Sequence, residues 1–116
     1  MFEDKCLFCR IIHRELPADI LFETDDILVF NDINPQAPFH ILTIPKKHIA
    51  CISDIEEADA ELLGKIIFSA KKVAKDLGIE NGGYRMVFNN GRHGGQDIYH
   101  IHLHLLGGRQ MRWPPG

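Results

Sequence analysis

The sequence has no long hydrophobic run, no excess of positive charge and no even set of cysteines. Its apolar runs are only a few residues long, whereas a membrane-spanning helix needs about 20, so we expect no membrane partner. The first residues, Met-Phe-Glu-Asp-Lys-Cys, lack the apolar region of a signal peptide, and three cysteines cannot all pair, which favours a cytoplasmic protein with reduced thiols. The net charge of −3 argues against nucleic acid as a partner, because phosphate backbones are bound by basic patches.

The length and the apolar content fit one domain. With 116 residues, of which 45% are hydrophobic, the chain can bury one core but not two, so we expect a single domain over residues 1–116. Runs rich in β-branched and aromatic residues predict strands at 20–23, 27–30, 40–45 and 84–89, the first two forming a hairpin. Residues 6–12 predict a short helix or turn, which the Leu16-Pro17 pair ends.

A long amphipathic helix is predicted over residues 53–77. Ser53 and Glu56 form the pattern of a capping box at its start, and Gly78 follows its last residue. Apolar residues recur at helical spacing on the side expected to face the sheet: Leu62, Leu63, Ile66, Ile67, Ala70, Val73, Ala74 and Leu77. Together these elements predict an α+β fold, with a five-stranded antiparallel sheet, one long helix and one short helix.

Three histidines alternate with apolar residues near the end of the chain, in His100-Ile101-His102-Leu103-His104-Leu105-Leu106. In a strand this spacing places the histidines on one face and the apolar residues on the other. Neighbouring histidines would lie roughly 6–7 Å apart, so at most two of them could share one metal ion. The pattern instead predicts a central nucleophile, His102, with a polar neighbour on each side.

Two further features of the sequence predict binding sites. Asn89 leads into a glycine-rich loop at residues 91–97, in which backbone N–H groups can meet an anion beside the histidines. Cys6 and Cys9 form a CxxC pair, which in a cytosolic protein indicates metal binding or redox chemistry, and a redox motif would need a βαβ context that the sequence does not show. His48 and His100 are available to complete a zinc site, and the alternative is a pair of buried free thiols.

The histidine spacing and its flanks resemble the histidine triad (HIT) superfamily of nucleotide hydrolases and transferases. The intact HφHφHφφ pattern carries the resemblance, and it covers nearly the whole chain. Its HINT branch is indicated by the flanking sequences, which are Gly94-Gly95-Gln96, Gly107-Gly108-Arg109-Gln110-Met111 and Trp113-Pro114-Pro115-Gly116. The resemblance implies a HIT-like fold and a homodimer with joined sheets, in which the C-terminal tail reaches toward the partner's active site.

The resemblance also implies the chemistry. His102 would attack the α-phosphorus of a purine nucleoside phosphoramidate, such as adenosine 5′-phosphoramidate or an aminoacyl or lysyl adenylate, giving a nucleotidyl-histidine that water hydrolyses to AMP. His104 would donate to the phosphate or the leaving group, His100 would orient, and His40 would support the site. The nucleotide-binding residues would be Phe8, Ile11, Phe30 and Ile33 around the purine, Asp32 on the ribose, and Asn89, Gly95, Gln96 and Asp97 near the phosphate.

Two points qualify this expectation. Asp97 stands where several HINT proteins have serine, and a carboxylate beside a phosphate is repulsive, so we expect slower turnover or a different leaving-group preference. Zinc-bearing relatives are similar at Cys6, Cys9, His48 and His100, which implies a structural zinc that catalysis does not require. The alternatives are a dinucleoside polyphosphate hydrolase of the same superfamily and a nucleotide-binding interaction module with vestigial catalysis.

Overall fold

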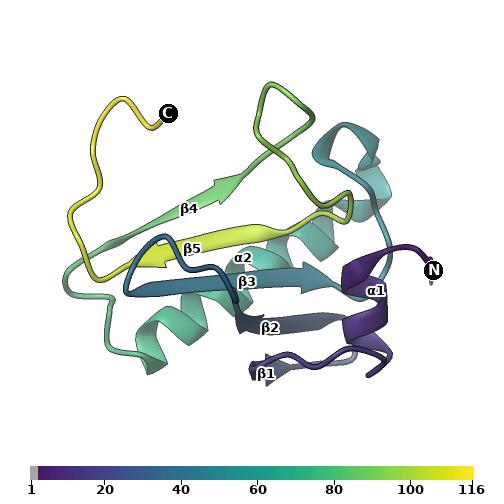
Figure 1. The fold of residues 1–116 in the computed structure, drawn as a ribbon, viewed down its shortest axis with the longest axis horizontal. Helices are drawn as coiled ribbons and strands as arrows, with labels where there is room; N and C mark the ends of the chain where they lie inside the picture. Colours follow the sequence, from purple (N-terminus) through teal and green to yellow (C-terminus); the bar gives the residue numbers. More distant parts are fainter. Residues whose placement is uncertain (1–2) are drawn as a thin grey trace.

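Five strands form one antiparallel sheet in the computed structural model, which describes residues 3–116 (Figure 1). Met1 and Phe2, with which the predicted domain begins, lie outside the described residues. The strand order is β1-β2-β3-β5-β4, and the bounds are β1 Ile20–Glu23, β2 Ile27–Asn31, β3 Phe39–Pro45, β4 Tyr84–Phe88 and β5 Leu103–Gly107. Two α-helices, α1 at Leu7–Ile12 and α2 at Ala60–Asp76, accompany the sheet. The predicted α+β architecture is therefore confirmed, and no helix among residues 3–116 is long and apolar enough to cross a membrane.

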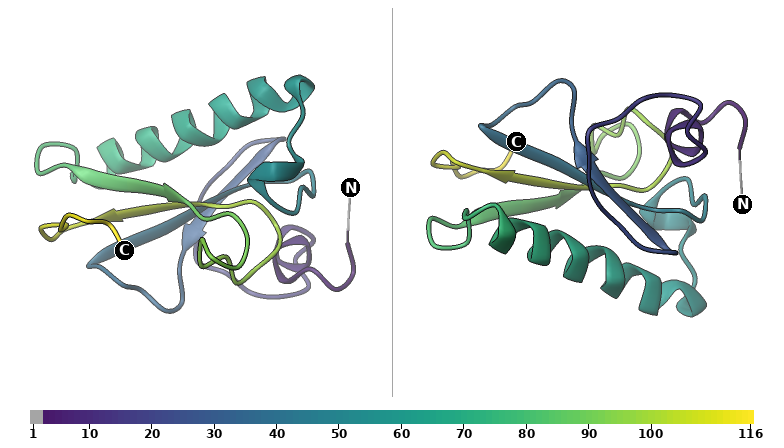
Figure 2. Two further views of the ribbon diagram at one scale, coloured as in Figure 1. Left: turned by 90° about the horizontal axis from the view of Figure 1, so that it is seen from above. Right: turned by 90° about the horizontal axis from the view of Figure 1, so that it is seen from below.

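The sheet is covered on both faces, which separates the scaffold from the site. Helix α2 lies along one face, and α1 lies on the other (Figure 2). On the α2 face, alternate strand residues pack against the helix: Ile27, Val29, Ile41, Leu103 and Leu105 meet Ile66, Ala70, Val73 and Ala74. On the α1 face, Leu28, Phe30, Leu42 and Ile44 meet Phe8, Cys9 and Ile11. Because side chains alternate along a strand, His40 and His104 also belong to the α1 face.

The long helix starts later than the sequence predicts. Residues Ile52–Asp54 and Glu57–Asp59 form two short 3₁₀ turns instead, separated by Ile55 and Glu56 in an extended conformation. The Ser53 N–H donates to Asn90 Oδ1 at 2.9 Å, and the Glu56 N–H donates to Asp59 Oδ2 at 2.9 Å. The predicted capping box at Ser53 is thus wrong, because a side chain from a distant loop captures the donor that such a box would have to satisfy.

The other predicted boundaries differ by smaller amounts. Helix α2 ends at Asp76 and is followed by Gly78 with φ +77°, the left-handed conformation expected after a helix. Ile67 was predicted to face the sheet but is 47% exposed, because the buried stripe of the helix is narrower than the apolar pattern suggests. Helix α1 ends at Ile12, well before Leu16.

Candidate functional site

The three histidines at residues 100–104 do not all lie in one strand. Strand β5 begins at Leu103, so only His104 belongs to it, where it pairs with Leu42 of β3 and Val87 of β4. His102 precedes the strand, and its ring centroid lies 4.9 Å from that of His104. The ring of His100 is fully buried, with its Nδ1 atom 3.3 Å from the sulfur of Cys6. The prediction of one row of three imidazoles is therefore corrected to a pair, His102 and His104, and a third ring that faces the cysteines.

His102 is held in the tautomer that a nucleophile needs. Its Nδ1–H donates to the backbone carbonyl of His100 at 2.7 Å, and the ring is 95% buried with the edge of Phe8 against it. Because a carbonyl oxygen can only accept, the proton must be on Nδ1, and the lone pair is therefore on Nε2.

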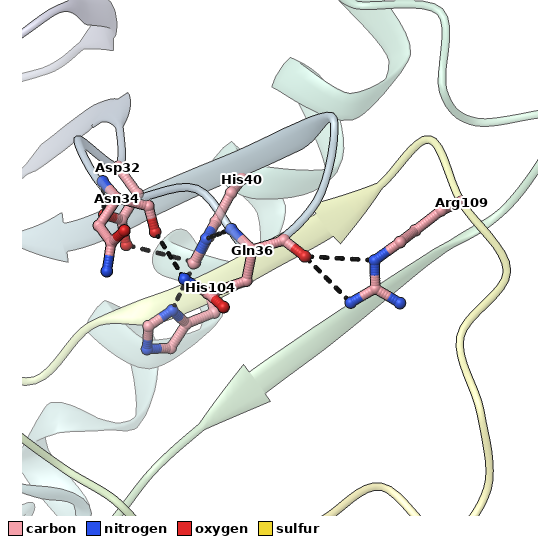
Figure 3. A network of polar contacts seen from close by, with 6 residues as sticks. All are labelled: Asp32, Asn34, Gln36, His40, His104 and Arg109. Atoms are coloured by element: carbon pink, nitrogen blue, oxygen red, sulfur yellow. Dashed lines mark hydrogen bonds and ion pairs between the residues drawn. The ribbon is translucent and has the colours of Figure 1, made fainter.

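His40 fixes the tautomer of His104 through a chain of hydrogen bonds (Figure 3). The Gln36 N–H donates to His40 Nδ1 at 3.0 Å, so the proton of His40 is on Nε2, which donates to His104 Nδ1 at 2.9 Å. The proton of His104 is consequently on Nε2, a buried atom with no hydrogen-bond partner among residues 3–116. Such an atom is a donor without an acceptor, and an oxygen of a bound ligand would satisfy it.

Burial keeps both of these rings neutral. It lowers the pKa of His104 to about 4, and it also lowers the pKa of His40. The Asp32 carboxylate opposes the second effect, since its Oδ2 lies 3.3 Å from His40 Nε2. The other carboxylate oxygen of Asp32 accepts the Asn34 N–H at 2.8 Å, which shapes the turn after β2.

A cavity of about 460 Å³ lies in front of His102 and His104, between α1, β2 and the loop that follows β2. Its volume is within the usual range for a small-molecule site. The four apolar residues predicted to clamp a purine all line the cavity, namely Phe8, Ile11, Phe30 and Ile33. Asp32, which is half-buried, and Asp97, which is exposed, line it as well. Three of the four are buried, whereas Ile33 is 95% exposed.

The remaining predicted residues are not all in this cavity. Asn89 lines a second cavity, of about 430 Å³, which also contains His104 and His40. The N–H groups of Gly95 and Gln96 already donate within the loop, to the carbonyls of Arg92 and Gly91 at 3.1 and 3.0 Å. The predicted anion contacts of these two N–H groups would require those bonds to open.

The side chain of Gln96 stabilises the glycine-rich loop through hydrogen bonds to the backbone. Its Oε1 accepts the Gly91 N–H at 2.9 Å, and its Nε2 donates to the carbonyls of Ala50 and Ile98 at 2.8 and 3.1 Å. Because all of its polar atoms are satisfied by the backbone, the side chain positions the loop and does not reach toward the cavity.

Cys6, Cys9, His48 and His100 bring four metal-ligating atoms together, all within 4.8 Å of one another. His100 Nδ1 lies 3.2 Å from His48 Nδ1 and 3.6 Å from the sulfur of Cys9, and the sulfur of Cys9 lies 3.4 Å from His48 Nδ1. A zinc ion at the centre of a tetrahedron of nitrogen and sulfur ligands would separate such atoms by about 3.3–3.8 Å. The observed separations therefore match those of a tetrahedral site.

The protonation states of the cluster also suit a metal. His100 Nε2–H donates to the carbonyl of Pro45 at 2.8 Å, so the lone pair on Nδ1 faces the thiols, and burial lowers the pKa of His100 to about 4. Burial raises the pKa of Cys9 to about 11. A bound cation would reverse this effect, because a coordinating thiol loses its proton. The four residues predicted for zinc thus fit that ion in both geometry and chemistry.

Comparisons with known proteins agree with this architecture. The structure superposes on that of a HIT family hydrolase from Legionella pneumophila Philadelphia 1 with a TM-score of 0.95 and 59% identity, covering 97% of this chain and 100% of the other. The chain belongs to the histidine triad (HIT) family. Residues 5–113 match the family model described as "Scavenger mRNA decapping enzyme C-term binding".

Two further relatives carry informative names. The 14 kDa zinc-binding protein of Zea mays is 51% identical over 112 residues, covering 95% of this HIT chain and 87% of the maize protein. The histidine triad nucleotide-binding protein from Candida albicans is 35% identical, with a TM-score of 0.81, covering 95% of this chain and 83% of the other. The predicted resemblance to the HIT superfamily and its HINT branch is confirmed by these relatives.

Sequence reasoning missed two features of this HIT site. Gln36 contributes its backbone N–H to His40, and no pattern in the sequence shows that a residue in a Pro-bounded turn would do so. Three arginines, at positions 85, 109 and 112, line the second cavity. Because they are separated along the chain, no local sequence pattern indicates this cluster. Only the strand register, which pairs Arg85 with Leu106, brings them to one place.

Proposed function

We propose that this HIT protein is a cytoplasmic purine nucleoside phosphoramidase, which hydrolyses adenosine 5′-phosphoramidate, or an aminoacyl or lysyl adenylate, to AMP and the amine. One observation carries the proposal: the free Nε2 lone pair of His102 lies beside the unpartnered Nε2–H of His104, in front of an apolar cavity. The names of two relatives support it, because the Legionella protein is called a hydrolase and the Candida albicans protein nucleotide-binding.

The base and the sugar would occupy the apolar cavity. Phe8 and Phe30 are buried in contact with each other, with ring centroids 5.5 Å apart, and with Ile11 they offer hydrophobic surface but no base-edge hydrogen bonds. We therefore expect both AMP and GMP to bind. The Asp32 carboxylate would accept the ribose hydroxyls with the lone pairs that Asn34 and His40 leave free.

In the first step His102 Nε2 attacks the α-phosphorus and the P–N bond of the substrate breaks. The electron pair of that bond leaves with the amine, which takes a proton from solvent. His102 keeps its Nδ1–H bond to the carbonyl of His100, so the new phosphoryl-imidazolium stays oriented. The Nε2–H of His104 donates to a phosphoryl oxygen and stabilises the charge that develops there.

In the second step water attacks the phosphorus of the nucleotidyl-histidine. The P–N bond to His102 breaks, the ring recovers its lone pair, and the water releases one proton to solvent as AMP forms. The neutral state of His104 suits both steps, because its low pKa of about 4 keeps it a donor through a single, fixed nitrogen at pH 7.

The Cys6–Cys9–His48–His100 cluster would hold a structural zinc ion. Four protein ligands close the coordination sphere, so the ion would stabilise the junction between α1 and the segment before β5 without contacting the substrate. The zinc-binding name of the maize relative supports this assignment. No cofactor would be needed for the chemistry itself.

A homodimer with joined sheets is the proposed assembly. Strand β4 is at the edge of the sheet, all five of its residues are half-buried, and its outer backbone groups are available for pairing with a second copy. Trp113 is 82% exposed, and the Arg85 Nη2–H donates to the carbonyl of Arg112 at 2.9 Å, so the tail lies beside β4 of its own chain. Sedimentation at micromolar concentration tests this assembly, and a monomer there would contradict it.

The decisive experiment is an acid-free rapid quench of the enzyme with adenosine phosphoramidate, followed by intact-mass measurement. We expect a transient adduct with the mass of one nucleotidyl group, located on His102. The His102→Ala variant should show neither adduct nor turnover. A variant that remained fully active would exclude His102 as the nucleophile. Faster hydrolysis of diadenosine triphosphate than of the phosphoramidate would favour the dinucleoside polyphosphate alternative.

A further inference from the structure

The second cavity, next to the nucleotide cavity, is rich in arginine. It has a volume of about 430 Å³ and is lined by three arginines, by Asn89 and by the histidine pair of the hydrogen-bond chain, namely Arg85, Arg109, Arg112, His40 and His104. None of the residues within 3–116 that line it is acidic. In a chain with a net charge of −3, this is a local concentration of positive charge.

Backbone carbonyls, not carboxylates, hold two of these guanidinium groups in place, those of Arg85 and Arg109. The Arg85 Nη2–H donates to the carbonyl of Arg112 at 2.9 Å, and Arg109 donates from Nε and Nη2 to the carbonyl of Gln36 at 3.2 and 3.1 Å. Among residues 3–116 none of the three forms an ion pair, in contrast to Arg10 and Arg14, which pair with glutamates. A carbonyl fixes the position of a guanidinium without cancelling its charge, so the cavity keeps that charge for a ligand.

The arginine cavity is connected to the reacting centre by His104. This residue lines both cavities, and its neighbour in β4, Val87, lies two residues from Arg85 on the same face of the sheet. Figure 3 shows the second connection, in which the carbonyl of Gln36 accepts from Arg109 while its N–H donates to His40, the partner of His104. A phosphorus atom held between His102 and His104 would therefore have the nucleoside in the apolar cavity and the arginine cavity on the side of His104.

We propose that the arginine cavity is the leaving-group subsite, and that it selects amine leaving groups that carry an anionic group, either a carboxylate or a phosphate. This inference rests on the function proposed above. The cavity supplies what such a group requires: several N–H donors with fixed positions and an uncancelled positive charge. Val87, Leu106 and Met111 add apolar surface for the carbon atoms between the amine and the anion.

The reaction is unchanged by this selection. The P–N bond breaks as His102 Nε2 bonds to phosphorus, and the amine departs with a proton from solvent and with its anionic group still on the arginines. Their contacts with the anion hold the leaving nitrogen in line with the attacking one, so the effect is expected in kcat/KM.

The test uses matched pairs of phosphoramidates with the full-length protein in its native assembly. The first pair joins AMP through nitrogen to glycine or to glycinamide, and the second joins AMP to 2-aminoethyl phosphate or to 2-aminoethanol. Each pair differs in one anionic group, and adenosine phosphoramidate is the reference substrate. The ratio of kcat/KM, anionic over neutral, is measured for the wild-type protein and for Arg85→Gln, Arg112→Gln and the double variant.

We expect the wild-type ratio to exceed one by about three- to tenfold for at least one pair, and the double variant to bring it close to one. Arg85→Lys, which keeps the charge but loses the planar donor pair, should retain part of the preference. Lys75→Gln, which removes a positive charge from the far helix α2, should leave the ratio at its wild-type value. The preference should also shrink in 0.5 M salt, because exposed charges are screened.

The two kinds of anionic group give different outcomes. A preference within the glycine pair alone indicates that the cavity binds a carboxylate, whereas a preference within the phosphate pair alone indicates that it binds a phosphate. A wild-type ratio near one for both pairs, with normal turnover of adenosine phosphoramidate, overturns this inference and leaves the proposed function intact. Equal loss of the ratio in Lys75→Gln would also overturn it, because the effect would then be one of overall charge. Failure to cleave adenosine phosphoramidate itself would refute the proposed function, and this inference with it.

Discussion

The hydrogen bond from His40 to His104 can be removed with little change in shape, by the substitution His40→Leu. His40 is buried in β3, its Nε2–H donates to His104 Nδ1 at 2.9 Å, and its Nδ1 accepts the Gln36 N–H at 3.0 Å. Leucine fills most of the same volume but offers neither donor nor acceptor. Without His40, the proton of His104 is free to occupy either ring nitrogen, and only the Nε2–H tautomer can donate to the substrate.

The expected effect follows from the strength of one hydrogen bond. A neutral hydrogen bond contributes about 1 kcal/mol net, so its loss should reduce the population of the productive tautomer and lower kcat about fivefold, with a smaller change in KM. The variant should also be less stable by about 1–3 kcal/mol, because the Gln36 N–H loses its acceptor and His104 Nδ1 its donor. These two effects are separable, since the first concerns the reaction and the second concerns unfolding.

Three measurements test this reasoning: steady-state kinetics with adenosine phosphoramidate, ¹⁵N chemical shifts of the His104 ring, and unfolding in guanidinium chloride. The matched control is His40→Gln, whose side-chain amide can donate to His104 Nδ1 and should restore part of kcat. A loss of kcat in His40→Leu with the ¹⁵N shifts of His104 unchanged would refute the tautomer argument. An unchanged kcat with a mixed tautomer population would show that the donor is not used in the reaction.

Other expected outcomes concern the neighbouring groups. Asp97→Ser should raise kcat about fivefold, because it removes a carboxylate from beside the phosphoryl group, and steady-state rates with two leaving groups that show neither a faster kcat nor a changed preference would contradict this. Purified wild-type protein should contain about one zinc per chain by plasma mass spectrometry, whereas Cys9→Ser should contain far less and melt on the order of 10 °C lower. A metal-free wild-type protein as stable as the zinc-loaded one would exclude the site. The pKa of His104 is about 4 in the folded protein and about 6.5 when unfolded, so its contribution to stability is complete above pH 6.5 and is lost as pH falls toward 4. In urea unfolding between pH 7 and pH 4, the free energy of unfolding should therefore fall less steeply with pH for His104→Asn than for the wild type. Identical pH slopes for the two proteins would be the contrary result.

The first four strands and the end of the long helix could be predicted because local sequence determines them. The apolar runs at β2 and β4 match the structure to within one residue, and Gly78 ends α2 as its conformational freedom requires. The start of α2 could not be predicted in this way. Ser53 has the right neighbours for a cap, but its N–H donates to Asn90, which is 37 residues away, and no local pattern contains that contact.

The same division applies to the site. Alternation correctly predicted that His104 faces away from α2, because side-chain direction within a strand follows from position alone. It could not predict where β5 begins. Ile101 donates its N–H to the carbonyl of Ile49 at 2.7 Å, outside the ladder of the sheet, and this contact with a distant segment leaves His100 and His102 before the strand. The arginine cavity could not be predicted from the sequence for the same reason, since strand pairing assembles it from distant positions.

His100 is the residue at which the metal cluster and the nucleophile meet. Its ring directs Nδ1 toward the thiols and donates from Nε2 to the carbonyl of Pro45, while its own backbone carbonyl accepts the Nδ1–H of His102. These functions lie close together on one residue, because the carbonyl carbon is two bonds from the Cβ atom that carries the ring. A substitution or metal loss that moves the backbone of His100 together with its ring therefore also shifts the acceptor that selects the tautomer of His102. The spacing of two residues between the histidines therefore has two effects. The side chain of His100 anchors the segment in the core, and the backbone carbonyl of His100 orients the ring of His102 toward the substrate.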